Sequence, residues 1–388
     1  MARPSEVVIR PFRSATSEAV LADLKARLAN SRYTDQLEGV GWSYGADGAY
    51  LRAFCDYWRD GFDWRAAEAR FNAFPQFITE IDGERLHFYH VRSREPDALP
   101  LILTHGWPSS VAEFLDVMAP LADPAIHGGD PRDAFHVIAP SIPGYGFSGP
   151  TRTPRFTAER AAAINAALMA RLGYERYGAH GGDWGAAITT LHAAAHPERL
   201  VGLHLNMISG RPADPDRPLA GLTAEEISEL EWRKGYDEHE TAYQRIQATK
   251  PQTLAFGLHD SPLGLAAWIL EKFRAWSDCG GDLESVFTKD RLLENVMLYW
   301  VTGTINSSMR LYFESLGPGR RFAYPDRIET PTGHARFPGE HARTPRAWAE
   351  QRYNIVHWTR QPRGGHFPAM EQPQLLVDDL RAFFRPLR

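Results

Sequence analysis

The residues best suited to chemistry lie in the segment Gly181-Gly182-Asp183-Trp184-Gly185. A β-prone run, YGAHGG (177–182), leads into it, and a helical pattern over 185–196 follows. A nucleophile flanked by small residues between a strand and a helix is the pattern of a nucleophile elbow, a turn so tight that bulky neighbours would clash. The same segment, taken alone, also fits a glycine-rich loop whose aspartate caps a helix.

The central residue of this elbow is Asp183, where serine is the usual occupant. A carboxylate is ionised at neutral pH and attacks without the help of a base. Attack on a saturated carbon leaves an alkyl ester, whose carbonyl water can then attack, whereas a serine would leave an ether that nothing nearby could cleave. Asp183 therefore indicates epoxides or alkyl halides as substrates, and not esters or peptides.

Backbone donors for an oxyanion are expected at two places. His105-Gly106-Trp107-Pro108 follows the first central strand, where hydrolases of this kind place half of an oxyanion hole. The backbone N–H groups of Trp107 and Trp184 could hold one oxygen of Asp183 and stabilise a tetrahedral oxyanion.

A base and an acid should follow the nucleophile in chain order. Among the 15 histidines, His366 stands out because Gly364-Gly365 precede it at the end of the last strand. Glu340, in FPGE, ends the preceding strand in the same way and could orient the imidazole. Asp326 and Glu329 are rivals that precede that strand and would lie at its wrong end, and Glu340 also fits a solvated loop glutamate.

Strand and helix patterns alternate after residue 75 and predict a parallel sheet covered by helices. From 211 to 327 the pattern becomes helical and aromatic, and strands resume only near 330. The expected division is an N-terminal helical segment (1–75), a core (76–210 and 328–388) and a helical lid (211–327) between two strands. Strands are expected at FITEI and RLHFYHV, which form a hairpin around Asp82-Gly83, and at 101–105, 136–140, 177–182, 200–206, 330–337 and 354–359.

The net charge, the longest apolar runs and the cysteine count exclude several classes of protein. A net charge of −5 in 388 residues gives no basic surface for nucleic acid. No run reaches the roughly 18 apolar residues of a membrane span, and MARPSEVVIRPF lacks the apolar core of a signal peptide. Two cysteines make neither a disulfide framework nor a zinc site. A soluble, cytoplasmic protein without a membrane anchor, metal or organic cofactor is expected.

Taken together, these motifs resemble the microsomal-type epoxide hydrolases of the α/β-hydrolase superfamily. The likeness runs nearly end to end through IRPF, HGWP, PSIPGYGFS (140–148), GGDWG, GLHLNM (202–207), YWVTGTINSS (299–308), FPGE and RGGHF. It implies an α/β-hydrolase fold with a mostly parallel sheet, an inserted helical lid and an N-terminal helical extension. Animal members carry an N-terminal membrane anchor, which this sequence does not show.

The resemblance also implies roles for particular residues. Asp183 would be the nucleophile, His366 the base and Glu340 its partner, with an epoxide and water as the reactants and a diol as the product. Two lid tyrosines would donate to the epoxide oxygen, and their flanking residues identify them as Tyr243, in AYQRIQATKP, and Tyr312, in MRLYFESLG. The sequence pattern itself does not distinguish these two from the other aromatic residues of the lid.

Two other functions compete with this interpretation. A haloalkane dehalogenase shares the aspartate nucleophile but would need side-chain N–H donors for the halide, and HGWP has a proline where a donor could lie. A non-catalytic small-molecule receptor on the same fold would have a broken triad. The lid aromatics favour an apolar epoxide that could bear an aryl group. Detoxification, natural-product biosynthesis and a homodimer all stay open.

Overall fold

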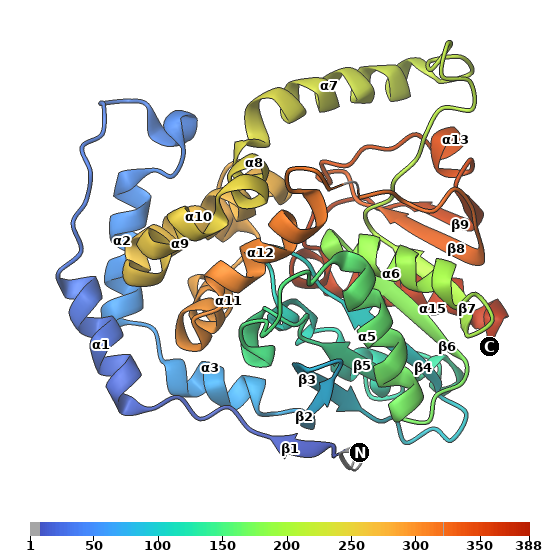
Figure 1. Ribbon diagram of the computed structural model, residues 1–388, viewed down its shortest axis with the longest axis horizontal. Helices are drawn as coiled ribbons and strands as arrows, with labels where there is room; N and C mark the ends of the chain where they lie inside the picture. The colour runs from blue at the N-terminus through green and yellow to red at the C-terminus, as the bar shows by residue number, and fades with distance from the viewer. Residues whose placement is uncertain (1–7, 321) are drawn as a thin grey trace.

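The computed structural model describes residues 8–320 and 322–388 (Figure 1). The expectation of no signal peptide concerns residues 1–12, of which 1–7 lie outside the described residues. Within the described ranges, no helix combines the length and the apolar character needed to cross a membrane.

One nine-stranded sheet forms the core, in the order β1-β2-β3-β5-β4-β6-β7-β8-β9. The first three strands pair antiparallel, β3 also runs antiparallel to β5, and the other neighbours are parallel. The strands are β1 (Arg10–Phe12), β2 (Gln76–Ile81), β3 (Glu84–Val91), β4 (Leu99–Thr104), β5 (Phe135–Pro140), β6 (Tyr177–Gly181), β7 (Leu200–Leu205), β8 (Ile328–Arg336) and β9 (Tyr353–Arg360). This is the mostly parallel α/β sheet that the sequence predicts, and the fold class is confirmed.

The predicted hairpin is the connection between β2 and β3. Its two turn residues, Asp82 and Gly83, have φ values of 53° and 73°. Positive φ at both central residues is the geometry that matches the twist of two hydrogen-bonded strands, and Asp-Gly tolerates it better than most pairs.

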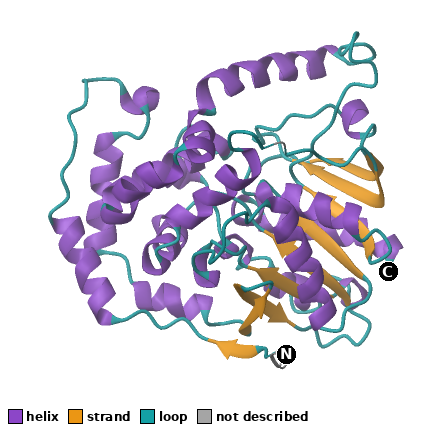
Figure 2. Ribbon diagram, in the orientation of Figure 1, coloured by secondary structure: helices purple, strands orange, loops and turns teal. Residues whose placement is uncertain are grey.

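Helices cover both faces of the sheet and continue beyond it (Figure 2). Helices α5 and α6 lie on one face, and α15 lies on the other (Figure 1). The helices are α1 (Glu18–Ala29), α2 (Gly48–Asp60), α3 (Trp64–Phe71), α4 (Met118–Ala122), α5 (Ala158–Arg171), α6 (Trp184–Ala195), α7 (Ala224–Glu240), α8 (Ala242–Thr249), α9 (Pro251–Asp260), α10 (Pro262–Trp276), α11 (Lys289–Thr302), α12 (Ile305–Leu316), α13 (Arg346–Ala349), α14 (Pro368–Glu371) and α15 (Pro373–Phe384).

Six of these helices, α7 to α12, follow β7 and precede β8, in the interval where the sequence predicts a lid. We propose that residues 211–327 act as this lid, with 76–210 and 328–388 as the core. The N-terminal segment, 1–75, differs from the expectation of helices alone, because β1 adds an edge strand to β2. Three residues are too few for a strand alternation to show in the sequence.

The N-terminal helices pack on the lid. Helices α1 and α2 lie against α10 (Figure 1). The Trp58 indole N–H lies 3.1 Å from Met297 Sδ, and the Tyr57 hydroxyl donates to Asp290 at 2.7 Å. These contacts join the start of the chain to helix α11, more than 230 residues away in sequence.

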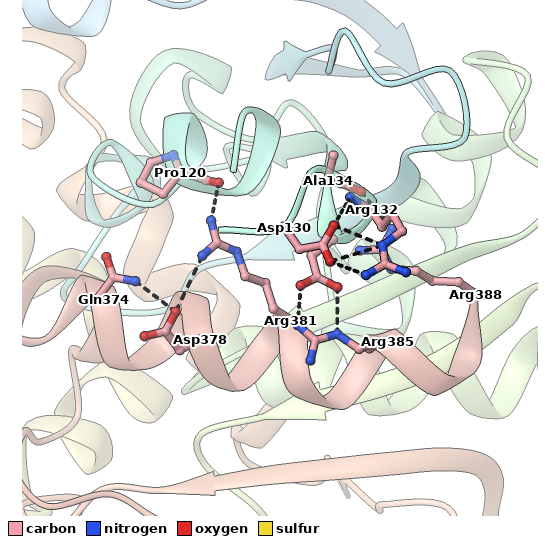
Figure 3. Close-up of polar contacts among 10 residues, drawn as sticks. Pro120, Asp130, Arg132, Ala134, Gln374, Asp378, Arg381, Arg385 and Arg388 are labelled. Atoms are coloured by element: carbon pink, nitrogen blue, oxygen red, sulfur yellow. Dashed lines mark hydrogen bonds and ion pairs between the residues drawn. The ribbon is translucent and has the colours of Figure 1, made fainter. Parts of the chain in front are cut away.

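The C-terminal helix α15 is fixed to the core by polar and apolar contacts. Arg385, directly after the helix, forms a bidentate ion pair with the buried Asp133. Arg381 donates to the carbonyl oxygen of Pro120 at 2.8 Å (Figure 3). The ring of Phe383 faces Gly202 of β7 and Gly333 of β8, where an added Cβ would come within 3.0 Å and 2.7 Å of it. Glycine at these two strand positions therefore makes room for the ring.

We expect Phe383→Ala to destabilise the fold strongly. The side chain is 1% exposed, and removing a buried phenylalanine leaves a cavity that costs about 3–5 kcal/mol. Urea unfolding followed by tryptophan fluorescence would measure the change in the free energy of unfolding. The control is Phe256→Ala, because Phe256 is 71% exposed and should cost less than about 0.5 kcal/mol. Equal losses in the two variants would contradict this packing.

Candidate active site

Asp183 occupies a sharp turn between β6 and α6. Its backbone has φ 51° and ψ −127°, a strained conformation for a residue with a side chain, costing on the order of 1–3 kcal/mol. The glycines beside it are needed for space, since a Cβ on Gly185 would lie 1.8 Å from the Thr104 carbonyl oxygen and one on Gly181 would lie 2.3 Å from that of Gly185. The segment therefore has the geometry of an elbow, and the loop alternative is not needed.

One oxygen of Asp183 is held by the loop after β4. The backbone N–H of Trp107 donates to Asp183 Oδ1 at 2.8 Å. Gly106 lets the two loops approach, because a Cβ there would lie 2.3 Å from the same oxygen. Of the two expected donors, only Trp107 makes this bond among the described residues. Trp184 lies at the first position of α6.

His366 and Glu340 come together behind Asp183. His366 Nδ1 lies 2.9 Å from Glu340 Oε2 and 3.1 Å from Oε1, while His366 Nε2 lies 3.5 Å from Asp183 Oδ2. Gly365 allows this approach, since a Cβ there would come within 2.6 Å of the Trp276 carbonyl oxygen. The three residues expected from the sequence are thus one contact group.

The rival acids lie elsewhere. Asp326 pairs with Arg211 at 2.7 Å, and its side chain is 87% exposed. Glu329 pairs with Arg327 and is also exposed. Glu340, by contrast, is buried, so it is not the solvated loop glutamate that the sequence left open.

The charges of this group depend on one another. Burial alone would lower the pKa of His366, but the carboxylates of Glu340 and Asp183 outweigh it and raise that pKa to about 10. Burial would likewise raise the pKa of Glu340, yet the neighbouring imidazoles of His366 and His341 hold it well below its usual range. The charged imidazole stabilises the folded protein fully below about pH 6.5, and this contribution is lost as the pH rises through about 10.

The two tyrosines predicted from the resemblance lie close to Asp183. Tyr243 of α8 stacks on the Trp107 ring at 5.3 Å, and Tyr312 of α12 meets the Trp184 ring edge-on at 5.0 Å. Both are buried, which raises the pKa of each phenol above its usual range, and the negative charge of Asp183 adds to the effect. The structure therefore brings both predicted tyrosines to the site.

A cavity of about 470 Å³ opens on these groups. Asp183, Tyr243 and Tyr312 are part of its wall, and apolar side chains from the core and the lid make up much of the rest. Its further lining comprises Trp184, Ala187, Met207, Ile208, Leu230, Leu316, Phe322, Tyr324, His341 and Trp348, with charged and polar groups that include Arg233, Asp237, Gln244, Arg343 and Thr344. Such a concave, largely apolar space with a few convergent polar groups suits a small apolar ligand.

Sequence comparisons agree with this geometry. The family described as "Epoxide hydrolase N terminus" matches residues 9–114, and the family "alpha/beta hydrolase fold" matches 100–227. Epoxide hydrolase 1 of Sus scrofa is 39% identical over 403 residues, which cover 97% of this chain and 88% of the relative. This chain belongs to the epoxide hydrolase family.

Comparison with solved structures also places this chain in the epoxide hydrolase family. Juvenile hormone epoxide hydrolase from the silkworm Bombyx mori is similar with a TM-score of 0.91 and 34% identity, covering 99% of this chain and 95% of the other. The Aspergillus niger epoxide hydrolase gives a TM-score of 0.88 at 30% identity, with coverage of 98% and 97%. The resemblance expected from the motifs is confirmed, the protein is an enzyme of this class, and the dehalogenase and receptor alternatives are not favoured.

The epoxide hydrolase has three further buried acid–base groups near His366 that sequence reasoning missed. Burial raises the pKa of Glu113 and of Glu371 to about 7. His341 lies 2.8 Å from Glu340 Oε1. The only sequence signal was proximity to a motif: Glu113 follows HGWP, His341 follows FPGE and Glu371 follows RGGHF.

One set of side chains in the epoxide hydrolase could gather around a metal ion. Glu340, His341 and His366 offer ligand atoms that all lie within 4.8 Å of one another. His366 Nδ1 already pairs with the carboxylate, so an ion would have to displace that bond. That the enzyme needs no metal or organic cofactor stays a prediction.

Glu340→Gln in the epoxide hydrolase should lower the pH at which His366 loses its proton. Removing an opposite charge at this distance should move the midpoint down by about one to three pH units from its high wild-type position. NMR of protein labelled with ¹⁵N-histidine reports the protonation of each ring nitrogen directly. Glu329→Gln is the control, because that glutamate is exposed and should leave the midpoint in place. An unchanged midpoint in Glu340→Gln would show that the carboxylate does not hold the charged imidazole.

Proposed function

We propose that the enzyme converts an apolar epoxide, which could bear an aryl group, to a vicinal diol through an alkyl ester on Asp183. Water activated by His366 would then hydrolyse this ester. The observation that carries the proposal is the placement of Asp183, with Oδ1 bonded to the Trp107 N–H and Oδ2 3.5 Å from His366 Nε2. This placement supports the proposal because the carboxylate lies beside both a backbone N–H donor and an imidazole.

In the first step the Asp183 carboxylate attacks a ring carbon of the epoxide, and the bond from that carbon to the ring oxygen breaks. Negative charge grows on this oxygen, and an alkoxide is a poor leaving group. The hydroxyls of Tyr243 and Tyr312 donate hydrogen bonds to the oxygen, and one of them transfers its proton to it. Because both rings are buried and packed against tryptophans, their position is fixed before the substrate arrives.

In the second step water attacks the ester carbonyl of Asp183. His366 takes the proton of this water, and the Trp107 N–H stabilises the tetrahedral oxyanion, with the Trp184 N–H as the second proposed donor. The bond from the carbonyl carbon to the alkyl oxygen then breaks, and the departing alkoxide takes a proton from His366 to give the diol. Asp183 now carries one oxygen from water and is a carboxylic acid, and its remaining proton passes to His366, which restores the starting charges. Glu340 orients the imidazole and stabilises its charged form.

The two steps are coupled through charge. The negative charge of Asp183 is one of the groups that raise the pKa of His366. Forming the ester removes this charge, so the imidazole releases its proton more readily at the stage when a base is needed. The proton released at this stage can replace the one that the tyrosines gave to the ring oxygen.

Replacing His366 with Gln should let the alkyl-enzyme accumulate. The variant keeps a side chain of similar size but has no base for the second step. Intact-protein and peptide mass spectrometry after mixing with a styrene-type epoxide should show the mass of one substrate added to the peptide that holds Asp183. Asp183→Ala is the control and should show no adduct.

A wild-type single turnover in heavy-oxygen water provides the decisive check of the ester. The label should enter Asp183 during the first turnover. Label that appears directly in the diol would mean that water opens the ring without an ester.

Loss of both lid hydroxyls should slow ring opening far more than loss of one. A single oxyanion-type donor is worth about 10²–10³-fold in rate, and the double variant has no acid left for the alkoxide. Single-turnover alkylation of Asp183 would be measured in Tyr243→Phe, Tyr312→Phe and the double variant. Tyr299→Phe is the control, since that buried hydroxyl donates to the Ser109 carbonyl oxygen at 2.7 Å. Alkylation at the wild-type rate in the double variant would refute the assignment.

A further inference from the structure

A second imidazole lies against the acid of the site. His341 follows Glu340 directly, is 7% exposed, and forms part of the cavity wall. Its Nδ1 lies 2.8 Å from Glu340 Oε1, and its ring centroid is 4.5 Å from that of His366. Glu340 therefore contacts two imidazoles. His366 Nδ1 lies nearest to Oε2, at 2.9 Å, and also lies 3.1 Å from Oε1, whereas His341 contacts Oε1, which accepts from the backbone N–H of Ala342 as well.

The ring of His341 is held by lid residues. The Trp276 indole, at the end of α10, stacks on it with centroids 5.0 Å apart and an interplanar angle of 18°. Tyr236 of α7 packs against it at 4.9 Å. Arg233, also on α7, donates to the carbonyl oxygen of His341 at 3.0 Å. Because these contacts fix the plane of the ring, its approach to Glu340 is built into the fold.

The contact with Glu340 is close but is not an aligned hydrogen bond, since Nδ1 of His341 forms no hydrogen bond with any of the described residues. The N–H of a neutral imidazole at this distance still places a positive end beside the carboxylate. Such a group competes with His366 for the same negative charge.

Charged and titratable groups face His341 and His366 from several elements. Glu340 faces His341 from its own loop, His366 faces it from the loop after β9, and Arg233 and Tyr236 face it from α7. Burial lowers the pKa of His341, Glu340 raises it and His366 lowers it again, with a lowered pKa as the result. His366 in turn faces Glu340, Asp183, Glu113 and Glu371. The lowered pKa of His341 and the raised pKa of His366 favour a neutral His341 beside a charged His366.

We propose that His341 is a positioning residue that shares the Glu340 carboxylate with His366 and weakens its hold on the proton of His366. This inference rests on the proposed two-step function. In the ester-hydrolysis step His366 acts only when it is neutral, so a weaker hold by Glu340 lets it act at lower pH. His341 thus sets the lower pH limit of the second step.

The test uses two variants of opposite kind. His341→Phe keeps the ring that packs between Trp276 and Tyr236 and removes both nitrogens. His341→Asn places an amide N–H close to the position of the imidazole Nδ1. Each variant and the wild type would be alkylated by a styrene-type epoxide in a single turnover. The rate of ester hydrolysis would then be measured between about pH 5 and 10, a range that includes both the ordinary pKa of histidine and a raised one.

In the pH profile of the hydrolysis rate, the rate rises as His366 loses its proton. In His341→Phe this rising limb should move to higher pH by about one unit, so that hydrolysis is roughly tenfold slower at pH values below it. In His341→Asn the limb should return to the wild-type position. Both variants should still form the alkyl-enzyme on Asp183, which shows that the site is folded, and the hydrolysis rate is measured from that preformed ester. A limb that does not move in His341→Phe, or that moves equally in both variants, would overturn the proposal.

A second measurement does not depend on the folding of a variant. NMR of the wild-type enzyme labelled with ¹⁵N-histidine should show His366 protonated and His341 neutral at pH 7, with the signals assigned from His366→Gln and His341→Asn. A proton on His341 in place of His366 would overturn the inference. Failure of the two-step function itself would look different, because no alkyl-enzyme would then form in His366→Gln.

Discussion

The strained backbone of Asp183 is the constraint on which the rest of the site depends. A residue with a side chain at φ 51° and ψ −127° persists only where the surroundings over-determine it. Here the surroundings are β6, α6 and the loop after β4, which come so close that Gly106, Gly181 and Gly185 have no space for a Cβ. Packing energy from the sheet thus maintains one unfavourable conformation, and that conformation points a carboxylate into the cavity.

Placing this carboxylate in a buried site creates an electrostatic problem that the neighbouring residues solve. Asp183 and Glu340 are both acidic, and Glu340 is buried. One imidazolium between them offsets the cost of burying like charges, which is why the pKa of His366 is raised although its burial acts in the opposite direction. The same arrangement makes the charge of Asp183 and the proton of His366 interdependent. In the proposed mechanism, the ester formed in the first step would therefore prepare His366 for the second.

Much of this site could be predicted from the sequence because it depends on local rules. The elbow shows itself through small residues around Asp183, and His366 through its glycines at the end of a strand. Glu340 was harder to predict, since only its position after a strand favoured it over Asp326 and Glu329. Tyr243 and Tyr312 came from the resemblance alone, because their role depends on how a lid of many aromatic residues packs over the core. His341 was missed for a related reason: stacking between Trp276 and Tyr236 brings it to Glu340, and no periodicity records a stacking contact.

The fold follows the same division between local and distant information. The parallel strands are short apolar runs between helices, and the hairpin has its own turn residues, so both were predicted. Strand β1 was not, because it exists only through its pairing with β2, 64 residues further on at closest register. The lid helices carry clear helical patterns, but their order over the cavity is set by tertiary contacts.

The contacts between the N-terminal helices and the lid have a consequence for how ligands enter and leave the cavity. Helices α1 and α2 pack on α10, which buries eight residues, so this side of the lid is fixed in place. Helix α7 buries only Tyr236 along its 17 residues, although Leu230, Arg233 and Asp237 on it line the cavity. Segments with few buried contacts open at low free-energy cost. Ligands are therefore expected to enter and leave the cavity beside α7, and the rate of product release would depend on how strongly the contacts of that helix hold it in place.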